Sequence, residues 1–138
     1  MNGNRVTLIT LGVSDLARSK AFYEDLGFVA EDSPPSVVFF DCGSYRFGLF
    51  PLAELAKEQG RDPDDLRTGA MSLSQNYPDR AGVDAAHARA LAAGAAQITA
   101  PTETAWGGYS GYVADPDGHV WEFAYNPFWP LDAEGHLE

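Results

Sequence analysis

The chain has 138 residues, of which 45% are hydrophobic and 12% aromatic, and its formal net charge at pH 7 is −11. This length corresponds to about one domain, and the composition can supply a buried core without disulfides. The negative charge excludes functions that depend on binding the DNA or RNA backbone, because phosphates would be repelled and no stripe of Lys or Arg compensates. It favours a neutral or cationic ligand.

Signals for a cellular compartment are few. Cys42 is the only cysteine, so the chain has no internal disulfide. No apolar run reaches the roughly 18 residues that a membrane helix needs. The first residues lack the basic start and apolar block of a signal peptide. We therefore expect a cytoplasmic protein.

The first half of the chain predicts one long helix with strands on either side. Residues 6–13 are rich in β-branched side chains and predict a strand. Ser14 is expected to cap the helix that follows, and Gly27 to end it. Gly43-Ser44 predicts a hairpin turn. Three shorter strands are predicted after the helix, at residues 28–31, 37–41 and 45–50.

The second half repeats this order. An alanine-rich helix is predicted at residues 83–93, closed by Gly94, and Pro116-Asp117-Gly118 forms a turn that matches Gly43-Ser44. Strands are predicted at residues 70–75, 97–102, 109–114 and 120–125. Because a β-α-β-β-β unit occurs twice, the chain contains an internal repeat.

The repeat predicts an α+β protein with a single domain over residues 1–138. Its parts are module one (5–50), a linker (51–68), module two (69–125) and a C-terminal arm (126–138).

Several short motifs are arranged in a specific order. Gly12-Val13-Ser14-Asp15-Leu16, Phe22-Tyr23 and Leu26-Gly27-Phe28 open module one, and Asp115-Pro116-Asp117-Gly118 with Trp121-Glu122 closes module two. From about residue 5 to 125 the chain thus resembles the vicinal oxygen chelate superfamily, which includes glyoxalase I, bleomycin-resistance proteins, fosfomycin-modifying enzymes and extradiol dioxygenases. The resemblance implies paired βαβββ modules forming an open, cup-shaped sheet with a binding cleft, and often a homodimer. Because this fold carries several chemistries, it does not by itself give the function.

The resemblance also implies four metal-ligand positions, one on the first and one on the last strand of each module. They fall at Leu8, Phe47, Ala70 and Glu122. Only Glu122 has a side chain that can bind a metal, and a single carboxylate does not hold a catalytic divalent ion. A slip of one residue would offer Thr7, Arg46 and Gly69, which are no better. We therefore predict no metal centre and no cofactor.

The three histidines do not restore a metal site. His87 is predicted on the surface of the alanine-rich helix or at an interface, His119 in a turn and His136 in a polar tail. No two of them have the spacing of metal ligands.

Strand alternation predicts which side chains line the cup. Val120, Glu122 and Ala124 share one face, whereas Trp121, Phe123 and Tyr125 should pack under the helices. In module one the same count places Tyr45, Phe47 and Leu49 on the cup face. The aromatics of the glycine-rich stretch 106–112 form either the rim of the cleft or part of the core. The candidate ligand-binding residues are Leu8, Tyr45, Phe47, Ala70, Trp106, Tyr109, Tyr112 and Glu122.

Three functions stay open from the sequence. The first is a metal-free protein that binds or sequesters an amine or an aromatic compound, with Glu122 as the anchor. The second is a metal-independent isomerase or lyase that acts on a small carbonyl compound, with Glu122 as general acid or base. The third is a domain whose dimer surface matters more than its cleft. The expected partners are a small-molecule ligand and a second copy of the chain, but neither nucleic acid nor a membrane.

Overall fold

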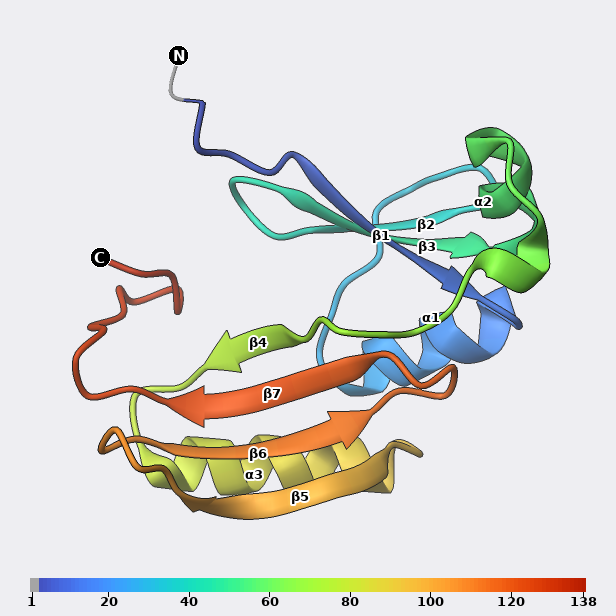
Figure 1. The fold of residues 1–138 in the computed structure, drawn as a ribbon. Helices are drawn as coiled ribbons and strands as arrows, with labels where there is room; N and C mark the ends of the chain where they lie inside the picture. The colour runs from blue at the N-terminus through green and yellow to red at the C-terminus, as the bar shows by residue number, and fades with distance from the viewer. Residues whose placement is uncertain (1–2) are drawn as a thin grey trace. The chain divides into compact units, whose positions relative to one another are not determined.

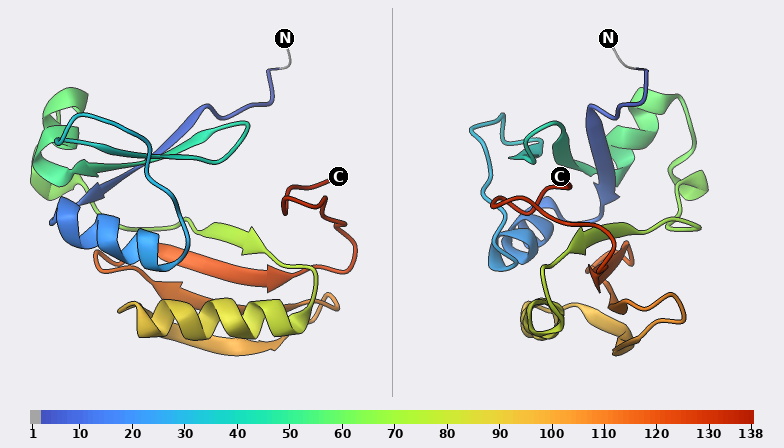
Figure 2. Two further views of the ribbon diagram at one scale, coloured as in Figure 1. Left: turned by 180° about the vertical axis from the view of Figure 1, so that it is seen from behind. Right: turned by 90° about the vertical axis from the view of Figure 1, so that its left-hand side faces the viewer.

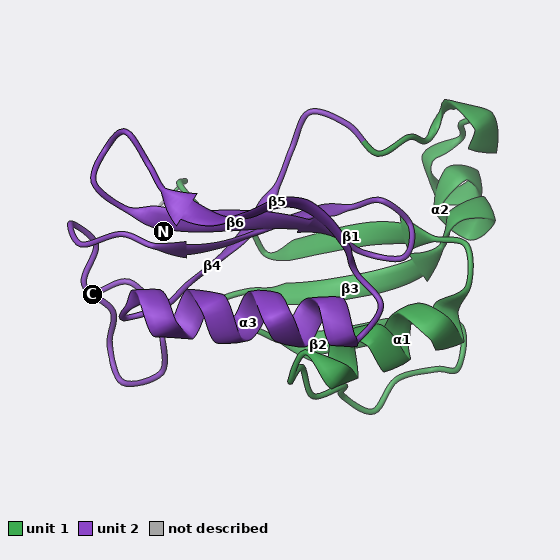
Figure 3. Ribbon diagram, turned by 90° about the horizontal axis from the view of Figure 1, so that it is seen from below, with its two compact units in different colours: residues 1–68 green, residues 69–138 purple. Residues whose placement is uncertain are grey.

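The computed structural model describes residues 3–138, and the chain divides into two compact units, residues 1–68 and 69–138 (Figure 3). Each unit contains one sheet, which is packed by α1 and α2 in unit one and by α3 in unit two, and neither sheet closes on itself (Figure 1). The predicted α+β class is confirmed. Within the described residues, every helix is too short or too polar to cross a membrane.

Unit one contains a three-stranded sheet of order β1-β3-β2, in which β1 is parallel to β3 and β2 is antiparallel to it. A short α2 follows β3 directly and packs on β1 and β3. The elements are β1 (Leu8–Val13), α1 (Leu16–Asp25), β2 (Val38–Asp41), β3 (Arg46–Pro51), α2 (Leu52–Gln59) and a 3-10 helix (Pro63–Asp65).

Two local predictions for unit one are wrong. The cap of α1 is Asp15 rather than Ser14, because the Asp15 side chain accepts a hydrogen bond from the backbone N–H of Arg18 at 3.0 Å. The strand expected at residues 28–31 is reduced to a single bridge between Ala30 and Phe40. The prolines at 34 and 35 come soon after this bridge and have no backbone N–H, so pairing does not extend.

The core of unit one is a cluster of aromatic rings. Phe47 is 2% exposed, and its ring centroid lies 5.0 Å from that of Tyr23 on α1, and 5.5 Å from those of Phe28 and Phe40. The strand face that carries Phe47 and Leu49 therefore packs against α1. The prediction that Tyr45, Phe47 and Leu49 line a ligand cup is wrong for this face.

Unit two repeats the plan with a four-stranded sheet of order β4-β7-β6-β5. Its first strand is again parallel to its last, and β6 is antiparallel to both of its neighbours. Helix α3 lies along one face of this sheet (Figures 1 and 2). The elements are β4 (Leu73–Asn76), α3 (Arg80–Ala92), β5 (Ala96–Glu103), β6 (Tyr109–Ala114) and β7 (Val120–Tyr125).

Helix α3 begins three residues earlier than predicted. Asp79 caps it by accepting a hydrogen bond from the backbone N–H of Gly82 at 2.8 Å. The sheet face beneath α3 carries Trp121 and Phe123, which are buried as predicted. The opposite face of the same sheet is therefore the one that carries Glu122.

His87 is buried between α3 and the sheet rather than on the helix surface. It is 4% exposed, and its Nε2 lies 2.8 Å from Oε1 of Gln97. Its Nδ1 has no hydrogen-bond partner among residues 3–138. Gly111 leaves room for the ring, since a Cβ at that position would lie 3.0 Å from His87 Nδ1 and 2.9 Å from the backbone nitrogen of Pro101. His87 is thus a core residue of unit two.

Candidate functional site: the carboxylate face of unit two

The carboxylate of Glu122 lies on the sheet face opposite α3 and is half-buried. Tyr112 lies opposite Glu122 in the β6–β7 ladder, and its hydroxyl donates a hydrogen bond to Glu122 Oε2 at 3.1 Å. Within unit two, residues 69–138, this phenol is the only group that bonds or pairs with the carboxylate, and no Lys or Arg of that unit forms an ion pair with it.

The pair changes the chemistry of the phenol. Partial burial raises the pKa of Tyr112, and the neighbouring Glu122 carboxylate raises it further through its charge and its hydrogen bond. Tyr112 therefore keeps its proton at neutral pH and holds one oxygen of Glu122 in place. The other oxygen, Oε1, remains able to accept hydrogen bonds.

Polar side chains continue across this face onto neighbouring strands. Ser74 of β4 lies beside Glu122 in the parallel ladder, and its hydroxyl donates to Asn76 Oδ1 at 3.3 Å. Ser110, two residues before Tyr112, is on the same face. The face around Glu122 is therefore mixed, with polar groups at Ser74, Ser110 and Tyr112 and apolar side chains at Val120 and Ala124.

The two hairpins show which residue of unit one corresponds to Glu122. Cys42 donates its backbone N–H to the carbonyl of Tyr45, so two residues form that turn. Asp115 donates to the carbonyl of His119, so three residues form the other. Gly48 lies three residues after Tyr45, and Glu122 lies three residues after His119. Glu122 therefore corresponds to Gly48. The position predicted at Phe47 is therefore displaced by one residue and belongs to the opposite face.

The first strands can be matched in the same way. Ser74 lies opposite Glu122, and Thr10 lies opposite Gly48. Leu8, two residues before Thr10, therefore corresponds to Ser72. Ala70 is exposed and lies three residues before β4, so the position predicted there is displaced by two residues.

The other predicted aromatic residues have contacts of their own within their units. Tyr109 is on the α3 face, where its hydroxyl donates to Asp84 Oδ1 at 2.6 Å and Arg80 covers its ring. Trp106 is about half exposed in the β5–β6 loop, where its ring covers Gly108. Tyr45 belongs to the hairpin of unit one, where it is half-buried beside Cys42. Of the predicted aromatic residues in unit two, only Tyr112 is shown to contact Glu122.

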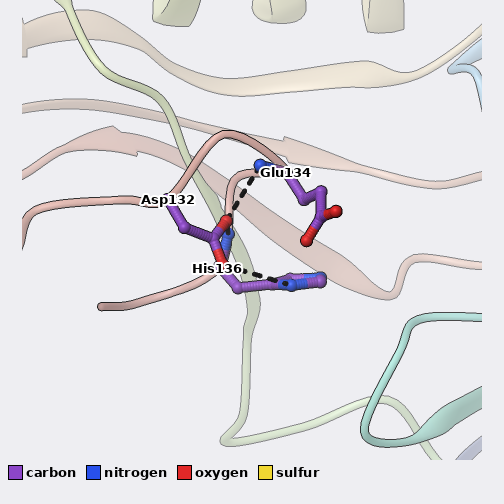
Figure 4. A group of neighbouring side chains, drawn as sticks. All are labelled: Asp132, Glu134 and His136. Carbon is purple, nitrogen blue, oxygen red and sulfur yellow. Dashed lines mark hydrogen bonds and ion pairs between the residues drawn. The ribbon is translucent and has the colours of Figure 1, made fainter.

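A second group of potential ligands lies in the C-terminal arm. One ligand atom each from Asp132, Glu134 and His136 lies within 4.8 Å of the others (Figure 4). The turn itself explains this grouping, because Asp132 Oδ1 accepts the backbone N–H groups of Glu134 and His136, both at 2.9 Å. These backbone hydrogen bonds, led by that from His136, lower the pKa of Asp132. We assign no metal site to these exposed side chains.

Comparison with known proteins identifies the family. The profile of the Glyoxalase/Bleomycin resistance protein/Dioxygenase superfamily matches residues 5–123. The chain belongs to this superfamily. No curated protein sequence gives a significant match. The predicted homodimer and cytoplasmic location stay predictions.

Solved structures agree with this assignment. A glyoxalase-related enzyme from Fulvimarina pelagi is 33% identical, with a TM-score of 0.90 over 98% of this chain and 97% of its own. A lactoylglutathione lyase from Agrobacterium tumefaciens is 25% identical, with a TM-score of 0.72 over 95% of this chain and 100% of its own. A family enzyme from Burkholderia phytofirmans PsJN, at 24% identity and a TM-score of 0.78 over 86% of this chain and 96% of its own, shows the shared fold alone.

The residues at the family's metal positions do not fit a divalent metal. After the two corrections these positions hold Leu8, Gly48, Ser72 and Glu122, which supply one carboxylate and one neutral hydroxyl. A Cβ on Gly48 would already lie 3.2 Å from the ring of Phe39 and 3.5 Å from Leu8, so this position is crowded by apolar side chains. A catalytic divalent ion needs about three protein ligands. We therefore derive no metal-dependent step for this chain.

Proposed function

We propose that this protein is a metal-free, small-molecule-binding member of the superfamily, which binds an amine or aromatic cation and sequesters it. The observation that carries the proposal is the Glu122 carboxylate, which is half-buried and whose only partner within unit two, residues 69–138, is the neutral hydroxyl of Tyr112. Partial burial of an unpaired charge is unfavourable, and a cationic ligand would relieve it with a charge-assisted hydrogen bond.

The long-range electrostatic field supports the same ligand class. With a net charge of −11, the protein attracts cations and repels carboxylates and phosphates. The donor set at the family's metal positions supports the metal-free part of the proposal, because Leu8 and Gly48 have no side-chain lone pair. Binding would then depend on the side chains of the carboxylate face and on the aromatic group of the ligand.

Metal analysis tests the first part of the proposal. Protein purified without chelators and dialysed against buffer should contain much less than one equivalent of any divalent ion, as measured by mass spectrometry of the metals. One tightly held equivalent that survives dialysis would refute the metal-free assignment. If Glu122→Gln also lost that equivalent, the carboxylate would be its ligand.

A ligand screen tests the second part. Native mass spectrometry after incubation with cell extract, followed by a thermal-shift screen of amines and aromatic cations, should find a stabilising ligand. A ligand at ten times its Kd stabilises the protein by about 1.4 kcal/mol, which corresponds to roughly 3–6 °C for a chain of this size. Glu122→Gln should remove this shift. Glu58→Gln, which removes the same charge from the exposed side of α2, should keep it. An unchanged shift in Glu122→Gln would show that the carboxylate is not the anchor.

The alternative is a metal-independent isomerase or lyase, and the Tyr112–Glu122 pair is the observation that favours it. A phenol bonded to a carboxylate can transfer a proton to or from a carbonyl substrate. In that case Glu122→Gln should abolish turnover of small carbonyl compounds while their binding persists. Binding without any turnover in the unmodified protein supports sequestration instead.

A further inference from the structure

The hydrogen-bond pairing on the carboxylate face bears on which kind of cation it would accommodate. Tyr112 has directed its single O–H to Glu122 Oε2, and Ser74 has directed its single O–H to Asn76 Oδ1. Both side chains flank Glu122 on neighbouring strands. What they still present to a ligand is oxygen lone pairs, because a hydroxyl has one hydrogen to donate and two acceptor sites.

Ser74, Glu122 and Tyr112 lie side by side across β4, β7 and β6. Together they offer a ligand several hydrogen-bond acceptors and few donors. The acceptors are the second carboxylate oxygen, the phenol oxygen and the Ser74 oxygen, all on one face of adjacent strands. Two side chains of this face that can donate, Asn76 and Ser110, lie one ladder step away from Glu122, and Ser110 is buried. A ligand that itself only accepts hydrogen bonds, such as a ketone or an aldehyde, would leave these acceptors unsatisfied.

We propose that the ligand's charged group is a cation with two or more N–H donors, which means a protonated primary amine, an amidinium or a guanidinium. This inference rests on the proposed function and narrows its ligand class. A quaternary ammonium carries the same charge but has no N–H to offer, so it satisfies the Coulomb attraction and none of the acceptors. An amidinium can bond the free oxygen of Glu122 and a neighbouring hydroxyl oxygen together.

Tyr112 is a positioning residue in this scheme. By holding Oε2, its hydroxyl fixes the carboxylate in one orientation and leaves Oε1 for the ligand. Removing the hydroxyl leaves the negative charge in place but lets the carboxylate rotate. The loss should therefore appear in discrimination between N–H-bearing and fully methylated cations more than in affinity for cations in general.

The test uses four probes with the same benzyl or phenyl group: benzylamine, benzamidine, benzyltrimethylammonium and benzaldehyde. Isothermal titration calorimetry of the full chain should give Kd values for benzylamine and benzamidine at least tenfold lower than for benzyltrimethylammonium, with benzaldehyde the weakest. Glu122→Gln should bring the three cations within about threefold of one another. Tyr112→Phe should reduce the tenfold preference to about threefold while benzyltrimethylammonium affinity stays the same.

Tyr109→Phe is the matched control. It removes a phenol hydroxyl that also bonds a carboxylate, but on the opposite face of the same strand, so the preference should be unchanged. Circular dichroism and thermal unfolding confirm that each variant is folded.

Each outcome of this test bears on one proposal. Equal or tighter binding of benzyltrimethylammonium would overturn the N–H requirement and leave the proposed function intact. Tightest binding of benzaldehyde would overturn it in favour of the carbonyl enzyme. If none of the four probes binds and the extract screen yields a ligand without cationic N–H donors, the N–H requirement falls alone; an extract ligand with such donors upholds it. If neither probes nor extract give a ligand, the proposed function falls with it.

Discussion

Replacing Phe47 by alanine tests whether this side chain belongs to the core or to a ligand surface. Phe47 is 2% exposed and touches three other rings, at centroid distances of 5.0, 5.5 and 5.5 Å. Replacing a buried Phe by Ala typically lowers the free energy of unfolding by about 3–5 kcal/mol. Each aromatic pair that is lost contributes about 0.5–1.5 kcal/mol to this cost. We therefore expect Phe47→Ala to lower the free energy of unfolding by about 4 kcal/mol.

The assay is urea unfolding followed by far-UV circular dichroism. With a slope near 2 kcal/mol per M, a loss of about 4 kcal/mol shifts the midpoint by roughly 2 M. Phe47→Leu keeps most of the volume but loses the ring contacts, so its loss should be at least about 1.5 kcal/mol and smaller than that of Phe47→Ala. Leu8→Ala, at a side chain that is 44% exposed, should change stability by about 1 kcal/mol or less.

One result would refute the assignment of Phe47 to the core. Suppose that Phe47→Ala changes the free energy of unfolding by less than about 1 kcal/mol and weakens ligand binding instead. The side chain would then line the ligand surface, and its assignment to the α1 face would be wrong. An equal loss in Phe47→Ala and Phe47→Leu would show that ring contacts, rather than volume, dominate the cluster.

Three further predictions follow from the described contacts. Gly111→Ala should destabilise by about 1–3 kcal/mol in urea unfolding, because its Cβ meets Pro101 and His87, whereas Gly69→Ala, with nothing within 4 Å, should be neutral. The raised pKa of Tyr112 in the folded protein means that its stabilising contribution is complete below pH 10 and is lost above it, so Tyr112→Phe should flatten the alkaline fall of stability between about pH 10 and 12. The lowered pKa of Asp132 works in the opposite direction, and the amide protons of the C-terminal turn should lose exchange protection as the pH falls below about 4.

The sequence predicts the elements well where periodicity and turn residues agree. The strands β3, β6 and β7, the helix α1 and the internal repeat all follow from alternation, caps and glycines. Prediction fails where tertiary context decides. The strand at 28–31 is reduced to the bridge between Ala30 and Phe40, and the prolines at 34 and 35 follow soon after it. His87 was predicted at the surface because its neighbours on the helix are small. Gly111 of β6, which lies beneath the helix, nevertheless leaves space for its ring.

The candidate site shows why faces are harder to predict than elements. Glu122 was found from the sequence because its hairpin motif is unambiguous, but its partner Tyr112 was predicted only as a rim residue. The signal was present: three turn residues between Asp115 and His119 place Tyr112 directly opposite Glu122. Reading it requires knowing which residue pair closes the hairpin, and glycine positions alone do not give this.

The same difference of one turn residue explains the error at Phe47. Because side chains alternate with a period of two, a shift of one residue exchanges the core face and the ligand face of a strand. Gly43 lies two residues before Tyr45, which closes the first hairpin, whereas Gly118 lies one residue before His119, which closes the second. Counting four residues from each glycine therefore reaches Glu122 in one strand and a core ring in the other. The metal argument survives this correction, because a glycine and a phenylalanine are equally unable to ligate. The prediction that Phe47 lines the cup does not survive, and the binding that we propose for unit two uses the hydrogen-bonding groups around Glu122.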